Sequence, residues 1–271
     1  MRALASPDRP CYADFMLNCV LHGTATEHPP LLIVHGLFGS AKNWGVIAKR
    51  LSNTRQVIAV DMRNHGGSFW SDVHDYPALA NDLAEVIAAH GGRADVLGHS
   101  MGGKAAMMLA SSHPEAVHRL IVADIAPVGY GHTQVHLIHA MRRLELDGVT
   151  RRSEVDALLT KDIPDAGTRA FLLQSLDLPN KSWRLNLDVL EAEMPKIIGW
   201  PGSEAQFLQP TLFLAGGDSD YVTPNSRPAI RALFPKARFA KIPGAGHWLH
   251  AEKPREFEAA VRTFLDARAS G

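Results

Sequence analysis

The chain has 271 residues, 46% of them hydrophobic, which suits one large domain, or one domain with an inserted subdomain, around a sizeable core. Lysine plus arginine and aspartate plus glutamate both number 28, and this neutral balance predicts neither a nucleic-acid nor an anionic-membrane partner. The two cysteines, Cys11 and Cys19, match no disulfide framework or metal-binding spacing. We expect a cytoplasmic protein, because residues 1–10 lack the apolar core of a secretory signal and no apolar run approaches the ~20 residues of a spanning helix.

Short apolar runs alternate with helical patterns along the first half of the chain. The predicted strands are residues 14–22, 31–34, 57–60, 94–97 and 119–123, and the predicted helices between them are 44–51, 76–90 and 103–111. Most of these strands are apolar at every position, which is typical of strands buried on both faces of a parallel sheet. The pattern predicts an α/β fold, with a mostly parallel, doubly wound sheet between two layers of helices.

The segment of residues 129–209 interrupts this alternation. It contains no convincing strand, several prolines, and helical patches at 134–146, 153–159, 168–176 and 185–194. Two further strands, 211–215 and 238–242, and a final helix, 256–268, follow it. We therefore predict a core of residues 1–128 and 210–271, with a helical cap of residues 129–209 inserted over the edge of the sheet that carries the functional residues.

The sequence Gly98-His99-Ser100-Met101-Gly102 lies between a predicted strand and a predicted helix. In that context G-x-S-x-G is typical of a nucleophilic serine on a sharp turn that lifts the hydroxyl clear of the backbone. The two glycines leave room where the strand and the helix approach each other closely. We predict that Ser100 is a nucleophile; the alternative is a serine that only caps the helix.

A serine hydroxyl reacts only when a base takes its proton, and the predicted base is His247. Among fourteen histidines, it alone lies late in the chain, in a glycine-rich loop between the last predicted strand and the final helix. His99 adjoins the serine but is expected to point away from it. His35 is expected to have a structural role, and His250 to pack near the final helix.

Two aspartates could orient the imidazole of His247 and stabilise its charged form. Asp124 follows the strand after the nucleophile helix, and Asp220 lies in the loop after strand 211–215, so both give the chain order Ser, Asp, His. Asp218, in the same loop as Asp220, is more typical of a turn. An aspartate at the end of a buried strand needs a partner, but the residues alone leave Asp124 and Asp220 open.

Acyl chemistry also needs hydrogen-bond donors for an oxyanion. The backbone amide of Met101 is one candidate, because it follows the nucleophile at the start of a helix. The other is the amide of Leu37, in the loop after His35-Gly36, with Phe38 as the alternative. A glycine-rich turn without chemistry is the other interpretation of residues 31–40.

Three cap histidines, His132, His136 and His139, are spaced by four and three residues, as metal ligands on one helix face can be. No carboxylate completes a known motif such as H-E-x-x-H, so we predict no metal and a solvated or pocket-facing helix face. Lys104, on the nucleophile helix, is either a surface residue or a bridge between cap and core. No cofactor is expected.

Taken together, the motifs resemble those of serine hydrolases with the α/β-hydrolase fold. The matching segments are H-G-L-F-G-S at 35–40, D-M-R-N-H-G at 61–66, G-H-S-M-G-G-K at 98–104 and G-A-G-H-W at 244–248, in the family's order. The chain is most similar to small short-chain carboxylesterases that carry the second and third of these motifs. In those esterases the Asp-Ile-Ala-Pro segment supplies the acid, which favours Asp124, whereas the family's general G-x-x-D-x-x-x-P pattern favours Asp220.

The resemblance implies hydrolysis of a short- to medium-chain carboxylic ester through an acyl-serine intermediate. The expected partner is a small-molecule ester, and the expected state is a monomer or homodimer. Thioesterase, lactonase, perhydrolase and carbon–carbon bond hydrolase activities are alternatives on the same triad, and a non-catalytic ligand-binding receptor is an alternative of another class. Related dehalogenases and epoxide hydrolases carry aspartate at the position of Ser100, which disfavours those activities.

Overall fold

The computed structural model describes residues 16–267, so Cys11 and the expectation made for residues 1–10 lie outside the described residues. The described residues form a seven-stranded sheet in the order β1-β3-β2-β4-β5-β8-β9. Its strands are β1 (Cys19–His22), β2 (Leu31–Val34), β3 (Val57–Val60), β4 (Ala94–His99), β5 (Val117–Ala123), β8 (Thr211–Gly216) and β9 (Ala237–Ile242). β1 pairs antiparallel with β3 and the other pairings are parallel, which confirms the predicted mostly parallel sheet.

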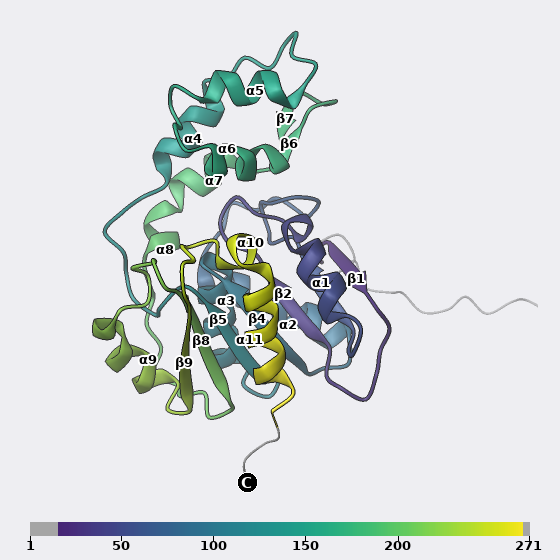
Figure 1. Ribbon diagram of the computed structural model, residues 1–271, viewed down its shortest axis with the longest axis vertical. Helices are drawn as coiled ribbons and strands as arrows, with labels where there is room; N and C mark the ends of the chain where they lie inside the picture. The colour runs from purple at the N-terminus through teal and green to yellow at the C-terminus, as the bar shows by residue number, and fades with distance from the viewer. Residues whose placement is uncertain (1–15, 268–271) are drawn as a thin grey trace, which may run out of the picture.

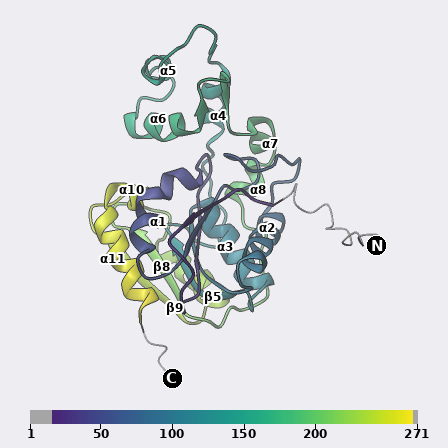
Figure 2. The same cartoon turned by 90° about the vertical axis from the view of Figure 1, so that its right-hand side faces the viewer.

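Helices cover both faces of this sheet, which Figure 2 shows between its two helical layers. On one face lie α2 (Tyr76–Ala89) and α3 (Met101–Ser112), and on the other lie α1 (Gly45–Leu51) and α11 (Pro254–Leu265). Successive residues of a strand point to opposite faces: Leu32 packs on the α2 and α3 side, whereas Ile33 packs on the α1 and α11 side. Strands β2 and β3 are buried at every position, and this is why they are apolar throughout.

Shorter elements complete the core. They are the 3-10 helices η2 (Ala41–Trp44) and η4 (Pro224–Ser226) and the α-helices α9 (Arg227–Leu233) and α10 (Leu249–Glu252). The sequence did not predict α9, which connects β8 to β9 and packs Ile230 into the core. Within residues 16–267, no helix combines the length and the apolar character needed to cross a membrane.

The chain between β5 and β8 forms a separate helical layer above the sheet (Figure 1). This layer contains α4 (Val135–Arg142), α5 (Arg152–Leu159), α6 (Ala166–Leu172), η3 (Leu173–Ser175), α7 (Leu187–Ala192) and α8 (Met194–Ile198). We call residues 129–209 the cap. The sequence predicted no strand here, but β6 (Leu176–Asp177) pairs antiparallel with β7 (Ser182–Trp183). Strands of two residues are too short to produce a visible alternation of apolar and polar residues.

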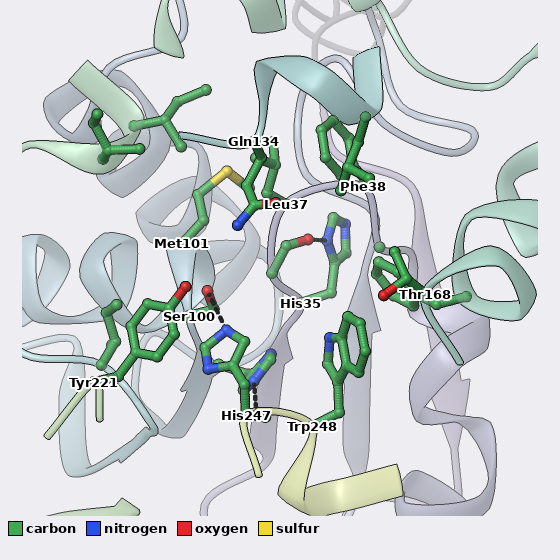
Figure 3. A pocket seen from close by; sticks show the side chains of 18 of the residues that line it. His35, Leu37, Phe38, Ser100, Met101, Gln134, Thr168, Tyr221, His247 and Trp248 are labelled. Carbon is green, nitrogen blue, oxygen red and sulfur yellow. Dashed lines mark hydrogen bonds between the residues drawn. The ribbon is translucent and has the colours of Figure 1, made fainter. Parts of the chain in front are cut away.

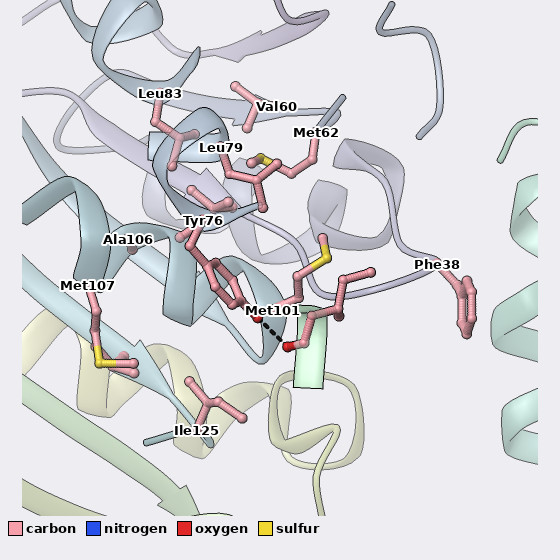
Figure 4. Packing of buried hydrophobic residues seen from close by; sticks show 14 of the residues in the cluster. Phe38, Val60, Met62, Tyr76, Leu79, Leu83, Met101, Ala106, Met107 and Ile125 are labelled. Atoms are coloured by element: carbon pink, nitrogen blue, oxygen red, sulfur yellow. Dashed lines mark hydrogen bonds between the residues drawn. The ribbon is translucent and has the colours of Figure 1, made fainter. Parts of the chain in front are cut away.

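The hydrophobic core continues from the sheet into the cap (Figure 4). Tyr76, at the start of α2, packs with Met101 and Ile125 in this cluster. Its hydroxyl donates a hydrogen bond of 2.5 Å to the carbonyl oxygen of Ile197 in α8. The buried side chain of Tyr76 therefore packs in the hydrophobic core and also attaches the cap to it.

The turn between β4 and α3 brings three segments unusually close together. A Cβ on Gly98 would overlap the carbonyl oxygen of Gly102, and a Cβ on Gly102 would overlap the carbonyl oxygen of His35. Strand β4, helix α3 and the end of β2 can approach this closely only because both positions are glycine.

Substituting alanine at this close approach should destabilise the fold. We expect Gly98→Ala to lower the free energy of unfolding by about 1–3 kcal/mol or more, because the added methyl group overlaps backbone that cannot move freely. Gly45→Ala is the matched control, since Gly45 has helical φ and a Cβ there would lie more than 4 Å from every heavy atom beyond its chain neighbours and its own helix backbone. Urea denaturation of both variants measures the difference, and equal stabilities would contradict the steric argument.

Candidate active site

Ser100 occupies a strained turn between β4 and α3. Its φ of 54° and ψ of −123° lie in a region that residues other than glycine rarely adopt. The amide of Ser100 donates to the carbonyl of Ala123 in β5, and its carbonyl accepts from the amide of Lys104 in α3, each at 3.1 Å. These bonds hold the turn, and Figure 3 shows the Ser100 hydroxyl facing the ring of His247.

The imidazole of His247 lies between Ser100 and Asp124. Its Nε2 is 3.0 Å from Oγ of Ser100, and its Nδ1 is 2.8 Å from Oδ2 of Asp124. An ionised carboxylate only accepts hydrogen bonds, so Nδ1 carries the proton and Nε2 is left to accept the proton of the serine hydroxyl. Residues 100, 247 and 124 are therefore linked in the order nucleophile, base and acid that acyl transfer requires.

The carboxylate of Asp124 is completely buried and has a partner for each oxygen. Oδ1 accepts from the amide of Gly216 at 3.0 Å. Oδ2 accepts from the hydroxyl of Ser219 at 2.5 Å as well as from His247. Such hydrogen bonds are what allow a carboxylate to remain ionised away from water.

The structure brings Asp124, and not Asp220, against His247. Asp220 and Asp218 are both exposed, in the loop that follows β8. Neither makes a hydrogen bond or ion pair to His247 within the described part of the chain. Asp124 reaches the ring because it directly follows β5, beside the turn after β4 that carries Ser100.

Two side chains at the site were not anticipated from the sequence. Ser219 lies between Asp218 and Asp220, and its hydroxyl donates a hydrogen bond to Asp124. The ring of Tyr221 stacks on His247, with 4.0 Å between ring centroids, and its hydroxyl lies 2.6 Å from Nε2 of His132 in the cap. The sequence offers one indication of both residues: they flank Asp220, in a loop that was already expected to lie beside the imidazole of His247.

The two predicted oxyanion donors lie beside Ser100. Met101 begins α3, where the first amides of a helix have no partner within it. The amide of Phe38, the alternative to Leu37, is engaged, because it donates to Nε2 of His65 at 3.1 Å. Among residues 16–267 the amide of Leu37 has no such acceptor, and Leu37 lines the cavity in front of Ser100. The arrangement leaves Leu37 and Met101 free to bind an oxyanion.

A cavity of about 420 Å³ lies between the core and the cap and opens onto Ser100. Leu37 and Ile125 line it from the core, whereas Leu137 and Ile197 line it from the cap. Polar side chains are also present; Figure 3 shows Gln134 and Thr168, from the cap, together with Tyr221 and Trp248 from the core. The cavity places a mostly apolar space directly in front of the serine hydroxyl.

A family model described as the alpha/beta hydrolase family matches residues 31–260. The chain belongs to the alpha/beta hydrolase family. It is 42% identical to mouse (Mus musculus) sn-1-specific diacylglycerol lipase ABHD11, over 91% of this chain and 83% of the relative. It is 40% identical to Esterase YbfF of Escherichia coli (strain K12), over 89% of this chain and 94% of the relative.

Among solved structures, a marine microorganism esterase matches this alpha/beta hydrolase with a TM-score of 0.86 and 36% sequence identity, over 92% of this chain and 99% of that chain. These findings confirm the family that the motifs suggested and the predicted α/β-hydrolase fold. They also identify the chain as an enzyme, a serine hydrolase.

Five histidines in the core of this hydrolase are buried, namely His35, His65, His74, His99 and His250. Burial lowers the pKa of each ring, to about 3 for His74 and His250. His99 lies next to Ser100 in sequence, but its Nε2 is 2.8 Å from the backbone oxygen of His247. The ring of His250 stacks on Trp44, with 4.1 Å between centroids. The lowered pKa values favour the neutral form of these rings.

A ring that is neutral in the folded state should make stability depend on pH. Burial lowers the pKa of His250 from 6.5 to about 3, so between these values the unfolded chain binds a proton that the folded enzyme does not. The free energy of unfolding therefore falls as the pH falls through this window.

Acidification from about pH 6.5 to pH 5 should lower the free energy of unfolding of both the native enzyme and His250→Leu. We expect the fall to be roughly 2 kcal/mol smaller in His250→Leu, because the variant lacks the buried ring of residue 250. Urea denaturation at both pH values measures the loss, and His113→Leu, at a partly exposed histidine, is the matched control. An unchanged loss on acidification would contradict the prediction.

Lys104 is a bridge between core and cap, with a side chain that is almost completely buried. Its Nζ donates to the carbonyl oxygens of Ile198 and Gly199, at 2.8 and 2.5 Å, at the end of α8. The ammonium also lies 4.8 Å from the centroid of the Tyr130 ring. Burial lowers its pKa to about 7. Helix α3, which begins just after Ser100, thus holds one wall of the cavity.

The three spaced histidines of the cap have separate surroundings. His132 contacts Tyr221, His136 lines the cavity, and Nε2 of His139 is 2.5 Å from a carboxylate oxygen of Glu191. Within residues 16–267, no group of three or more histidine, cysteine, aspartate or glutamate side chains is arranged to hold a metal ion.

Proposed function

We propose that this hydrolase cleaves short- to medium-chain carboxylic esters through an acyl-serine intermediate, with Ser100, His247 and Asp124 as its catalytic triad. The observation that carries the proposal is the unbroken hydrogen-bonded chain from the Ser100 hydroxyl through His247 to a buried carboxylate, facing a mostly apolar cavity. The relatives named as an esterase and a lipase support ester hydrolysis as the general reaction.

The first half of the reaction acylates the serine. Oγ of Ser100 attacks the carbonyl carbon of the ester while Nε2 of His247 takes the hydroxyl proton. Asp124 stabilises the imidazolium that forms, through its hydrogen bond to Nδ1. The former carbonyl oxygen becomes an oxyanion and accepts hydrogen bonds from the amides of Leu37 and Met101. His247 then gives its proton to the departing alcohol.

The second half releases the acid. A water molecule takes the place of the alcohol, and His247 removes one of its protons as it attacks the acyl carbonyl. The same two amides stabilise the second oxyanion. The intermediate collapses, Ser100 recovers its proton from His247, and the carboxylic acid leaves. Each proton moves between substrate, water and side chains, so the cycle needs no cofactor.

The cavity limits the size of the substrate. A volume of about 420 Å³ lies toward the lower end of the roughly 300–1,000 Å³ typical of small-molecule sites. Its apolar lining from Leu37, Ile125 and Ile197 suits a short hydrocarbon chain. Thioesters, lactones and peroxyacid-forming reactions present the same acyl carbon to the same residues, and they are alternatives that a substrate series distinguishes.

Removing the serine hydroxyl should abolish the reaction. We expect Ser100→Ala to lower kcat on p-nitrophenyl butyrate by at least about 10⁴-fold and to prevent labelling by a fluorophosphonate, because the attacking oxygen is gone. Ser112→Ala, at the other end of α3, is the matched control. Steady-state kinetics and intact-protein mass measure the two effects. A native enzyme that neither hydrolyses acyl substrates nor forms the adduct would support the receptor alternative.

The two aspartates should differ sharply. Asp124→Asn removes the acceptor that orients His247 and stabilises its charge, so we expect kcat to fall by on the order of 10²–10⁴-fold. Asp220→Asn changes an exposed side chain, and we expect kcat to stay within about threefold of the native value. Kinetics with the same ester, together with thermal melting, provide the comparison. A large loss in Asp220→Asn alone would exclude Asp124 as the acid.

A further inference from the structure

Two loops beside Ser100 exchange hydrogen bonds through a pair of buried histidines. The first, the oxyanion loop (residues 35–40), follows β2, and the second, residues 61–66, follows β3. Nε2 of His35, in the first loop, accepts from the amide of Met62 in the second at 2.9 Å. Nε2 of His65, in the second loop, accepts from the amide of Phe38 in the first at 3.1 Å. The centroids of the two rings are 5.1 Å apart.

The other nitrogen of each ring fixes its tautomer. Nδ1 of His35 lies 2.7 Å from the carbonyl oxygen of Gly36, and Nδ1 of His65 lies 3.0 Å from that of Arg63. A carbonyl oxygen can only accept, so both Nδ1 atoms carry a proton and both Nε2 atoms are bare acceptors. Burial lowers the pKa of both rings, which keeps them neutral and preserves the two acceptors.

These bonds hold the two peptide groups on either side of Leu37. His35 donates to the carbonyl of Gly36, which also accepts from the amide of Gly39 at 3.0 Å. A trans peptide points its N–H opposite to its C=O, so holding that carbonyl fixes the direction of the Leu37 amide. His65 holds the amide of Phe38 in the next peptide group.

The oxyanion loop needs such support because its backbone is strained. Phe38 has a φ of 63°, in the left-handed region that a bulky side chain disfavours. The carbonyl of Phe38 accepts from the hydroxyl of Ser175 in the cap at 2.9 Å, and the amide of Ala41 donates to Asp61 at 2.7 Å. Neither of these bonds touches the peptide amide of Phe38, which depends on His65.

We propose that His65 is a positioning residue for the oxyanion hole. With its ring as acceptor, the Phe38 amide is turned away from the cavity and the Leu37 amide is kept facing it. His65 touches no reacting atom and acts through the loop alone. This inference rests on the proposed function, because it assigns a role in stabilising the oxyanion of the same reaction.

The test replaces the acceptor while keeping the size of the side chain. In His65→Gln the amide oxygen can reach the position of Nε2, whereas His65→Leu has no acceptor. We expect His65→Leu to lower kcat on p-nitrophenyl butyrate by about 10–100-fold, less than the loss of a whole donor, with KM within about threefold. His65→Gln should stay within about fivefold of the native kcat.

A second readout separates oxyanion binding from general damage. A trifluoromethyl ketone forms a tetrahedral adduct with the serine whose oxygen occupies the oxyanion hole, so its Ki should rise in His65→Leu by the factor by which kcat/KM falls. A Ki that does not follow kcat/KM, or equal losses in His65→Gln and His65→Leu, would overturn the proposal. If His65→Leu does not fold, His65→Asn replaces it, because its oxygen is too short to reach Phe38; equal activities of the Asn and Gln variants would then overturn it.

Two controls make the outcome specific. His118→Leu removes a histidine that is hydrogen-bonded to Asp95 near the start of β5, at the opposite end of the sheet, and it should leave kcat and Ki unchanged. Ser100→Ala reports on the proposed function itself. If the native enzyme is active and Ser100→Ala is not, an unaffected His65 series overturns this inference alone; if the native enzyme has no acyl hydrolase activity, the proposed function fails instead.

Discussion

The carboxylate of Asp124 has no contact with solvent, and without partners a charge in such a place would cost several kcal/mol. Its three donors are the amide of Gly216, the hydroxyl of Ser219 and the ring of His247. They come from the end of β8, the loop that follows it and the loop after β9. Satisfying one buried charge therefore fixes how these segments meet the end of β5, and the same arrangement places His247 within reach of Ser100.

The buried histidines around Ser100 and His247 extend this arrangement without adding charge. His35 and His65 act as neutral acceptors for backbone amides, and His99 supports the backbone of His247. Burial lowers the pKa of these three rings, so they act as uncharged hydrogen-bonding groups around Ser100 and His247.

The cap is attached to this site through backbone carbonyls. The last carbonyls of a helix have no partner within it, and those at the end of α8 accept from Tyr76 and Lys104. Lys104 lies one turn after Ser100 on α3. The sequence left open whether this lysine is exposed, and neither the strands β6 and β7 nor the fit of the cap could be predicted. Side-chain contacts between distant segments decide these features, and local patterns do not encode them.

The sequence by itself determined the parallel sheet, the turn at Ser100 and the loop of His247, because apolar runs, glycine spacing and loop position are local properties of the chain. Tertiary structure decided which aspartate meets His247, since Asp124 and Asp220 satisfy the same chain order and differ only in what lies beside them. It also decided that the amide of Phe38, next to Leu37, is engaged by the ring of His65. The physical reason is the same in both cases, because each hydrogen bond joins residues that are far apart in the sequence. Phe38 and His65 are 27 residues apart, and Asp124 and His247 are 123 residues apart.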